Sequence, residues 1–148
     1  MFLLHFMEIK QALSKEEFIN CWGVVQHLRP LLTVDSFLNL VLFMLDESYK
    51  MLFTEEEGRA VSICGYRYNT MLHRGRSIYI DDLYTLEGYR GKGHASALLH
   101  HVFAEARENN LQSIHLDSGH QRFDAHRLYL QKGFRITDHH FSLELFYE

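Results

Sequence analysis

The feature of this sequence that most constrains its fold is a strand–turn–helix–strand unit spanning residues 77–117. Residues 77–85 are rich in Ile, Tyr and Leu and predict a strand. Apolar residues recur at helical spacing from Ala95 to Ala106, and residues 113–117 predict another short strand. The turn between the first strand and the helix, EGYRGKGH, is the most glycine-rich stretch of the chain. A unit of this kind indicates helices packed on a sheet.

The rest of the chain supplies elements of both types. Ser14 and Glu17 form the capping-box pattern of a helix start, and Pro30 ends that helix. A second helix, apolar nearly all round, follows Thr33 and reaches Leu45; we expect it to be buried, or else to cover substrate or form a dimer face. Gly65 predicts a bulge or a close backbone approach. Further strands are expected at residues 2–9, 50–54, 59–68, 134–136 and 141–146, with a polar connection at 69–76 and a helix at 123–131.

This order of elements predicts a mixed α/β (α+β) fold in one domain, residues 1–148, whose front half is antiparallel. The formal net charge of −4 disfavours nucleic-acid binding, which calls for a basic surplus. No apolar run approaches the roughly 18 to 20 residues that span a bilayer, so no membrane partner is expected. Cys21 and Cys64 stand far apart and fit buried thiols in a reducing, cytoplasmic setting. No spacing of histidines or cysteines predicts a metal site.

The glycine-rich turn is the part of the sequence that carries chemistry. Gly91 and Gly93 let backbone N–H groups approach a ligand, and the following helix adds free donors and a positive dipole end. Arg90 and Lys92 add positive charge at the same point. Together these features predict a phosphate or pyrophosphate site, although a glycine-rich turn that binds nothing has the same composition. Neither a Walker loop nor a GxGxxG dinucleotide fingerprint is present.

Two motifs point to a family. Arg90-Gly91-Lys92-Gly93-His94-Ala95 matches the pattern [QR]-x-x-G-x-[GA], and about thirty residues later Ala125, Tyr129, Gly133 and Phe134 match A-x-x-x-Y-x-x-x-G-F. With these motifs the chain resembles the GNAT superfamily of coenzyme-A-dependent N-acyltransferases. The resemblance implies a mostly antiparallel mixed sheet that splays open at the coenzyme A site, with about four helices.

The resemblance also implies how acetyl-CoA or coenzyme A is held. The pyrophosphate would lie on the N–H groups of residues 90–95, and the pantetheine arm would pair with the backbone of Leu83, Tyr84 and Thr85. Tyr129 takes the position of the tyrosine that faces the thioester sulfur in many members, where it protonates the leaving thiolate.

The base and the acceptor site are left open by the sequence. Asp82 and Asp117 are candidate bases, with Asp81, His120 and His126 as further candidates, and many family members use a water chain instead. Asp81 and Asp82 point to opposite faces of a strand unless a bulge intervenes. Arg122 stands where the family often has an Asn that touches pantetheine. We expect Arg122 either to replace that contact or to bind an acidic group of the acceptor, and His126 to contact the acceptor.

The expected activity is therefore acetyl transfer from acetyl-CoA to a primary amine, on a small molecule or a protein, through a ternary complex. The alternative is a non-catalytic acyl-CoA-binding sensor or interaction module, for which Tyr129 would be only structural. The acidic tract Glu55-Glu56-Glu57 and the pair Asp81-Asp82 hint at a cationic acceptor. The apolar second helix would serve a homodimer, as family members are often dimers.

Overall fold

A computed structural model of the chain describes residues 6–146. These residues form two compact units, one ending at His115 and the other beginning at Leu116. The first unit holds the sheet and three helices, and the second holds one helix and the C-terminal segment. Each unit is described by itself below.

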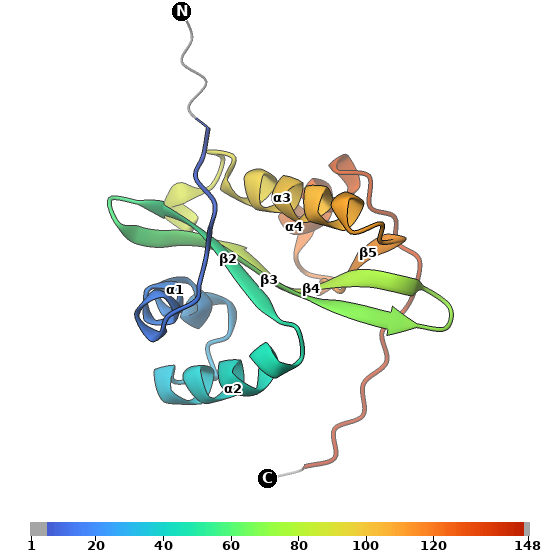
Figure 1. Ribbon diagram of the computed structural model, residues 1–148, viewed down its shortest axis with the longest axis horizontal. Coiled ribbons are helices and arrows are strands. Elements are labelled where there is room, and N and C mark those ends of the chain that lie inside the picture. Colours follow the sequence, from blue (N-terminus) through green and yellow to red (C-terminus); the bar gives the residue numbers. More distant parts are fainter. Residues whose placement is uncertain (1–5, 147–148) are drawn as a thin grey trace, which may run out of the picture. The chain divides into compact units, whose positions relative to one another are not determined.

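The sheet contains five strands whose order in space equals their order in sequence. The pairs β1–β2, β2–β3 and β3–β4 are all antiparallel, as expected for the front half of the chain (Figure 1). The strands are β1 (Lys10–Gln11), β2 (Lys50–Glu56), β3 (Arg59–Met71), β4 (Gly75–Thr85) and β5 (Ser113–Leu116).

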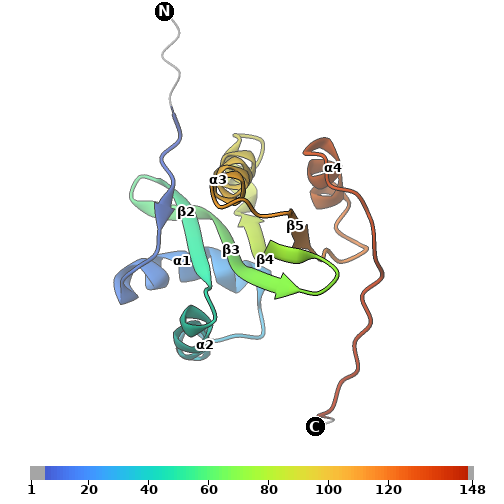
Figure 2. The same ribbon diagram turned by 45° about the vertical axis from the view of Figure 1, so that its right-hand side comes forward.

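Three helices of the first unit cover the two faces of the sheet. Helices α1 (Lys15–Leu28) and α2 (Val34–Asp46) lie on one face, and α3 (His94–Glu108) lies on the other (Figures 1 and 2). The predicted capping box of α1 is confirmed: Ser14 accepts from the Glu17 backbone, and the Glu17 carboxylate accepts from the Ser14 N–H. Thr33 and Ser36 form the same device at α2.

One core cluster of this unit lies between the sheet and helices α1 and α2. Phe18 and Phe37 are 4% exposed, and their rings meet edge to face with centroids 6.5 Å apart. Ile63 of β3 is completely buried beneath them in the same cluster. Cys21 and Cys64 are free and buried, and burial raises the pKa of Cys21 to about 12. Both thiols are therefore packing groups rather than nucleophiles.

The bulge predicted at Gly65 is confirmed and lies between β3 and β4. Gly65 pairs with Asp82, whereas the next residue, Tyr66, pairs with Ile80, so Asp81 is an extra residue in β4. A bulge bends its strand and re-aims the side chains around it. The two consecutive aspartates owe their joint position to this irregularity.

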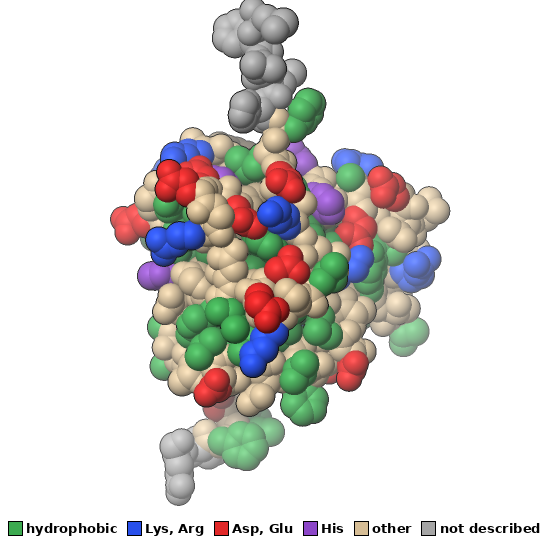
Figure 3. All heavy atoms as spheres, turned by 60° about the vertical axis from the view of Figure 1, so that its left-hand side comes forward, with side chains coloured by type: hydrophobic (Ala, Val, Ile, Leu, Met, Phe, Trp, Pro, Cys, Tyr) green, Lys and Arg blue, Asp and Glu red, His purple; other side chains and the backbone are tan. Residues whose placement is uncertain are grey.

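Several expectations are corrected by the structure. Helix α2 is not buried: Phe37 and Val41 are enclosed, but Leu42 and Phe43 are 66% and 74% exposed. Hydrophobic side chains lie at the surface in several places on the face drawn in Figure 3, with acidic and basic side chains among them. The connection at 69–76 is a tight hairpin, because β3 continues to Met71 and β4 begins at Gly75. The N-terminal strand is only Lys10–Gln11; residues 6–9 are not a strand, and residues 2–5 lie outside the described part.

The second unit contains α4 (Phe123–Gln131), whose bounds agree with the sequence prediction. Gly133, with φ of 95°, follows the helix as the left-handed residue expected there. The strands predicted at 134–136 and 141–146 are wrong, because this segment is not part of the sheet. Alternating polarity suits a strand, but a strand forms only where a neighbour accepts its backbone hydrogen bonds.

The predicted fold class is confirmed: a mixed α/β fold with a five-stranded sheet and four α-helices in the described residues. Within residues 6–146 no helix is both long enough and apolar enough to cross a membrane.

Candidate active site

The glycine-rich loop leads directly into the first turn of α3. A short 3₁₀ helix (Glu87–Tyr89) precedes it, and Gly91 and Gly93 adopt left-handed φ angles of 77° and 90°. Gly93 is the N-cap of α3, and no side chain caps the helix. The first-turn N–H groups have no acceptors within the helix, and the two left-handed glycines turn the backbone so that such groups can converge on an anion. The glycine-rich turn is therefore where the sequence predicted it, and the phosphate site itself stays a prediction.

The two cations of the loop have different settings. The Arg90 Nε donates to the carbonyl of Thr85 at 3.1 Å, and its guanidinium stacks 5.3 Å from the centre of the Tyr84 ring. Arg90 thereby fastens the loop to the end of β4. The Lys92 ammonium is half-exposed, lies 5.1 Å from the Tyr89 ring centre and is 3.5 Å from a carboxylate oxygen of Glu56. Lys92 is the cation better placed to reach a ligand.

His94, the first residue of α3, is buried with 3% of its surface exposed. Its Nδ1 lies 2.8 Å from the Thr54 hydroxyl, and its Nε2 lies 3.1 Å from the Glu56 carboxylate. Both partners belong to β2. The imidazole therefore anchors the start of α3, and with it the loop, to the second strand of the sheet.

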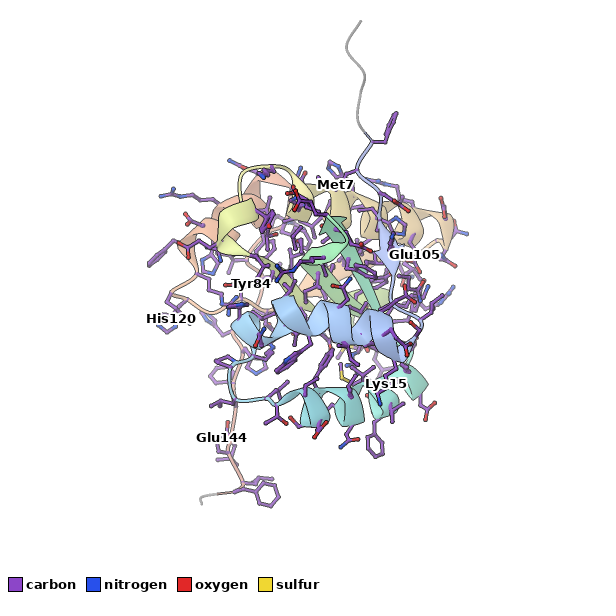
Figure 4. All side chains as sticks on the ribbon, turned by 90° about the vertical axis from the view of Figure 1, so that its left-hand side faces the viewer. Met7, Lys15, Tyr84, Glu105, His120 and Glu144 are labelled. Atoms are coloured by element: carbon purple, nitrogen blue, oxygen red, sulfur yellow. The ribbon has the colours of Figure 1, made fainter. Side chains whose placement is uncertain are left out.

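The end of β4 supplies the backbone that was expected to face pantetheine. Tyr84 and Thr85 pair with Ile63 and Ser62 of β3, and the Ser62 hydroxyl donates to the Tyr84 carbonyl at 3.1 Å. The same hydroxyl oxygen is 2.8 Å from the Thr85 hydroxyl. β4 lies between β3 and β5 in the sheet, so β5 is its neighbour on the other edge. Figure 4 shows Tyr84 well separated from Glu105, which lies toward the far end of α3.

Two side chains, Arg29 and Tyr49, bind the carboxylate of Asp82 beside the bulge. The guanidinium of Arg29, the residue that ends α1, donates to one carboxylate oxygen from Nε at 3.1 Å and from a terminal nitrogen at 2.9 Å. The buried hydroxyl of Tyr49 donates to the other oxygen at 2.8 Å. Burial and the Asp82 carboxylate raise the pKa of Tyr49 well above its ordinary value. Tyr49 is therefore a neutral donor that orients Asp82.

Asp81 lies in the same cluster because of the bulge. Its carboxylate pairs with Arg67, with a shortest distance of 2.5 Å, and Arg67 also reaches Glu47 at 2.8 Å. Burial raises the pKa of Asp81 above its usual range, although Arg67 opposes that shift. The sequence argument that only one of the two aspartates faces the site depended on a regular strand, and the bulge removes that condition. Arg29, Tyr49 and Arg67 were not anticipated.

The second unit carries the remaining candidates. The Tyr129 ring packs edge to face on Phe134, with centroids 5.8 Å apart, and the Tyr129 carbonyl accepts from the Phe134 N–H at 3.0 Å. Asp117 is half-exposed and lies 3.3 Å from the Nδ1 of His140. Arg122 occupies the N-cap position of α4, but its side chain makes no capping hydrogen bond. His126 packs near Phe123 one turn into the helix.

Within the described residues no cluster of three His, Cys, Asp or Glu side chains could hold a metal ion. The side-chain anchors Thr54, Glu56, Tyr49 and Arg29 were missed because each joins segments about 30 to 50 residues apart, a separation that periodicity does not report. The one available signal was Gly65: in a strand it indicates a close approach, and Tyr49 and Asp82 are what approaches.

The fold and the loop together define a class: a mixed sheet whose fourth strand runs through a glycine-rich loop into a helix, as in acyltransferases that use an acyl-CoA. The acetyltransferase (GNAT) family model matches residues 11–134. The chain therefore belongs to the GNAT family and is an acyltransferase of that type.

Known proteins agree with this membership. The chain is 34% identical over 137 residues to an uncharacterized N-acetyltransferase of Bacillus subtilis, YhdJ, an alignment covering 91% of this chain and 96% of that protein. Among solved structures it resembles an aminoglycoside N-acetyltransferase, AAC(6′)-Iy, in complex with coenzyme A (TM-score 0.81, 15% identity, 93% of each chain). It also resembles a ribosomal-protein-alanine N-acetyltransferase of Brucella melitensis (TM-score 0.76, 17% identity, 93% of this chain and 99% of that one).

Proposed function

We propose that this protein transfers the acetyl group of acetyl-CoA to a primary amine by direct attack within a ternary complex. The observation that carries the proposal is the uncapped start of α3 behind two left-handed glycines, with Lys92 beside it. Such a site suits the diphosphate of coenzyme A. Family membership supports the reaction class, and the geometry of the loop supports it as the place proposed for the co-substrate.

In this proposal the diphosphate lies on the backbone N–H groups of residues 90–95 (Arg90, Gly91, Lys92, Gly93, His94 and Ala95). The pantetheine arm runs along the end of β4, beside Leu83, Tyr84 and Thr85. Each carbonyl oxygen there has two lone pairs, so one can accept from a pantetheine amide while the other keeps its bond within the protein. A sheet that splays open at the coenzyme A site, as the family resemblance implies, would give the arm its room.

Acetyl transfer forms one bond and breaks another at the thioester carbon. The amine nitrogen forms a bond to that carbon, the carbon–sulfur bond breaks, and one amine proton is lost while the thiolate gains one. An amine with a pKa of about 10.4 is mostly protonated at neutral pH and must first lose a proton. Backbone N–H groups near Leu83 and Tyr84 would stabilise the oxyanion. Tyr129 would protonate the thiolate.

Asp82 and Asp117 remain the candidate bases, and the contacts of each suggest how it would act. One Asp82 oxygen accepts from Tyr49 and the other from Arg29, so its remaining lone pairs can accept from a water or an amine. Asp117 lies 3.3 Å from the Nδ1 of His140, and both side chains are more than half exposed, so water can reach the carboxylate. A water chain between the amine and either carboxylate is consistent with both settings.

The acceptor is a primary amine of a small molecule or a protein. The structural neighbours include enzymes named for an aminoglycoside and for a protein alanine, which supports the amine but not a choice between them. Arg122 and His126 are the side chains we propose for acceptor contact. We further propose a cytoplasmic protein of one domain that binds neither nucleic acid nor membrane, with the exposed face of α2 available for a homodimer.

The experiment is a calorimetric titration of the protein with acetyl-CoA, coenzyme A and ATP, followed by an acetylation screen over amines. Selective micromolar binding of the two coenzyme A species and turnover with an amine would support the enzyme. Binding without turnover on small amines or peptides would favour the alternative, a non-catalytic acyl-CoA sensor. If neither acetyl-CoA nor coenzyme A binds, the proposed binding role of the loop and the proposed catalytic residues are both wrong.

A further inference from the structure

Glu56, the last residue of β2, touches both sides of the Gly93 turn. One carboxylate oxygen lies 3.1 Å from the Nε2 of His94, and the other lies 3.5 Å from the ammonium of Lys92. Lys92 precedes Gly93 and His94 follows it. A single carboxylate therefore stands beside the turn on which the diphosphate is proposed to lie.

The position of this carboxylate is fixed by a buried chain of hydrogen bonds. An ionised carboxylate only accepts, so the His94 Nε2 carries a proton and donates it to Glu56. In the neutral ring the Nδ1 then accepts from the hydroxyl of Thr54, which is completely buried. Since the imidazole is 3% exposed, moving it would break its buried bond to Thr54, and moving the Glu56 oxygen would break a partly buried bond to the ring.

The contact between Glu56 and Lys92 is of a different kind. The Lys92 side chain is 52% exposed and the Glu56 side chain 34% exposed, so their ion pair is weak and exchangeable. A diphosphate at the start of α3 would compete with Glu56 for the same ammonium. It would also meet the negative charge of Glu56 itself.

We propose that Glu56 is an affinity-setting residue: it holds Lys92 in the cofactor-free protein and keeps coenzyme A binding weaker than the loop alone would make it. This inference rests on the proposed function of the loop. Glu56 touches no reacting atom and acts through Lys92 and by repulsion of phosphate. Its role is to let free coenzyme A leave after transfer, when Lys92 returns to the carboxylate.

The test is Glu56→Gln, titrated calorimetrically with coenzyme A and with adenosine 3′,5′-bisphosphate. The amide keeps an oxygen to accept from His94 but loses the charge, so the anchor stays and Lys92 is released. We expect both ligands to bind roughly two- to fivefold more tightly. The gain should shrink as ionic strength rises. In a Lys92→Met background the gain from Glu56→Gln should be smaller, because the ammonium that it frees is absent.

Glu57→Gln is the matched control, since it makes the same charge change one residue later, in the exposed turn. The inference is overturned if Glu56→Gln binds no more tightly than the unaltered protein, or if Glu57→Gln tightens binding equally. It is also overturned if the gain is undiminished without Lys92. If the unaltered protein does not bind coenzyme A at all, the proposed function itself is wrong, and that result is distinct from a failure of the Glu56 inference.

Discussion

Tyr129 tests the chemistry at the scale of a single residue. A thiol with a pKa of about 8.5 leaves readily, and a phenol with a pKa of about 10 is a weak acid for it. Tyr129→Phe should therefore lower kcat by roughly 100-fold and leave KM for acetyl-CoA nearly unchanged. Steady-state kinetics with the best acceptor measures both constants. An unchanged kcat at an unchanged melting temperature would show that Tyr129 is a packing residue on Phe134.

The glycines of the loop make a second residue-scale prediction. A Cβ at Gly91 or Gly93 would meet no atom within 4 Å, so conformation alone decides its effect. Because both φ angles are left-handed, an alanine at either position costs about 1 to 2 kcal/mol and bends the backbone away from the anion geometry. Gly93→Ala should weaken coenzyme A binding in a calorimetric titration. Gly88→Ala, which also meets no atom and has no left-handed φ, should bind as the unaltered protein does.

At this scale the sequence predicted those features whose partners lie within a few residues of one another. The Ser14–Glu17 capping box and the turn at Gly91 and Gly93 are local, so spacing alone predicted them. His94 was predicted only for its N–H group. Its imidazole proved to be the anchor of the loop, through Thr54 and Glu56, and contacts 38 to 40 residues apart leave no trace in local spacing.

At the scale of elements, the bulge between β3 and β4 predicts that the protein loses stability when Gly65 is replaced. A Cβ on Gly65 would overlap the Tyr49 hydroxyl and come within 2.9 Å of an Asp82 oxygen. Gly65→Ala should displace Tyr49, break its bond to Asp82 and lower the free energy of unfolding by about 1 to 3 kcal/mol. Chemical denaturation measures the change. Gly23→Ala is the matched control: its Cβ meets nothing, and in the middle of α1 it should add about 0.5 to 1 kcal/mol. Equal stability of the two variants would refute this account of the bulge.

Elements were predicted well where their ends carry signals and poorly where burial decides. The capping box predicted the start of α1 and Pro30 predicted its end. Helical spacing of apolar residues followed by Gly133 predicted α4. Helix α2 was placed correctly but expected to be buried, because composition does not say how much apolar surface finds a partner. The C-terminal strands failed for the related reason that alternation says nothing of a pairing neighbour.

At the scale of the whole molecule, one carboxylate ties α3 to the sheet. Glu105 accepts from Lys50 at 2.5 Å and from the hydroxyls of Tyr66 and Tyr68, so a helix on one face is bonded to two strands. Burial works to raise the pKa of Glu105, but the bonds from Lys50, Tyr66 and Tyr68 outweigh it, and the net shift is downward. The Lys50 ammonium also lies 5.3 Å from the centre of the Tyr68 ring.

This network predicts how global stability depends on pH. A carboxyl whose folded pKa lies below its unfolded value of about 4.3 adds stability above that value and loses it as the pH falls through the folded pKa. Glu105→Gln should therefore cost about 1 to 3 kcal/mol near neutral pH, because the amide presents donors to groups that also donate. Denaturant titrations of both proteins from about pH 7 down to about pH 3 should show the difference shrinking below about pH 4.

Glu108→Gln, an exposed carboxylate in the last turn of the same helix, separates this network from the general effect of charge. It makes an identical charge change one turn away, so it should alter the stability of the protein by less than about 0.5 kcal/mol at any of these pH values. A pH-independent cost of Glu105→Gln would mean that packing, not the ionised carboxylate, holds α3 to the sheet. Because the glycine-rich loop leads into the other end of α3, the ionised form of Glu105 would then be irrelevant to the position of that loop as well.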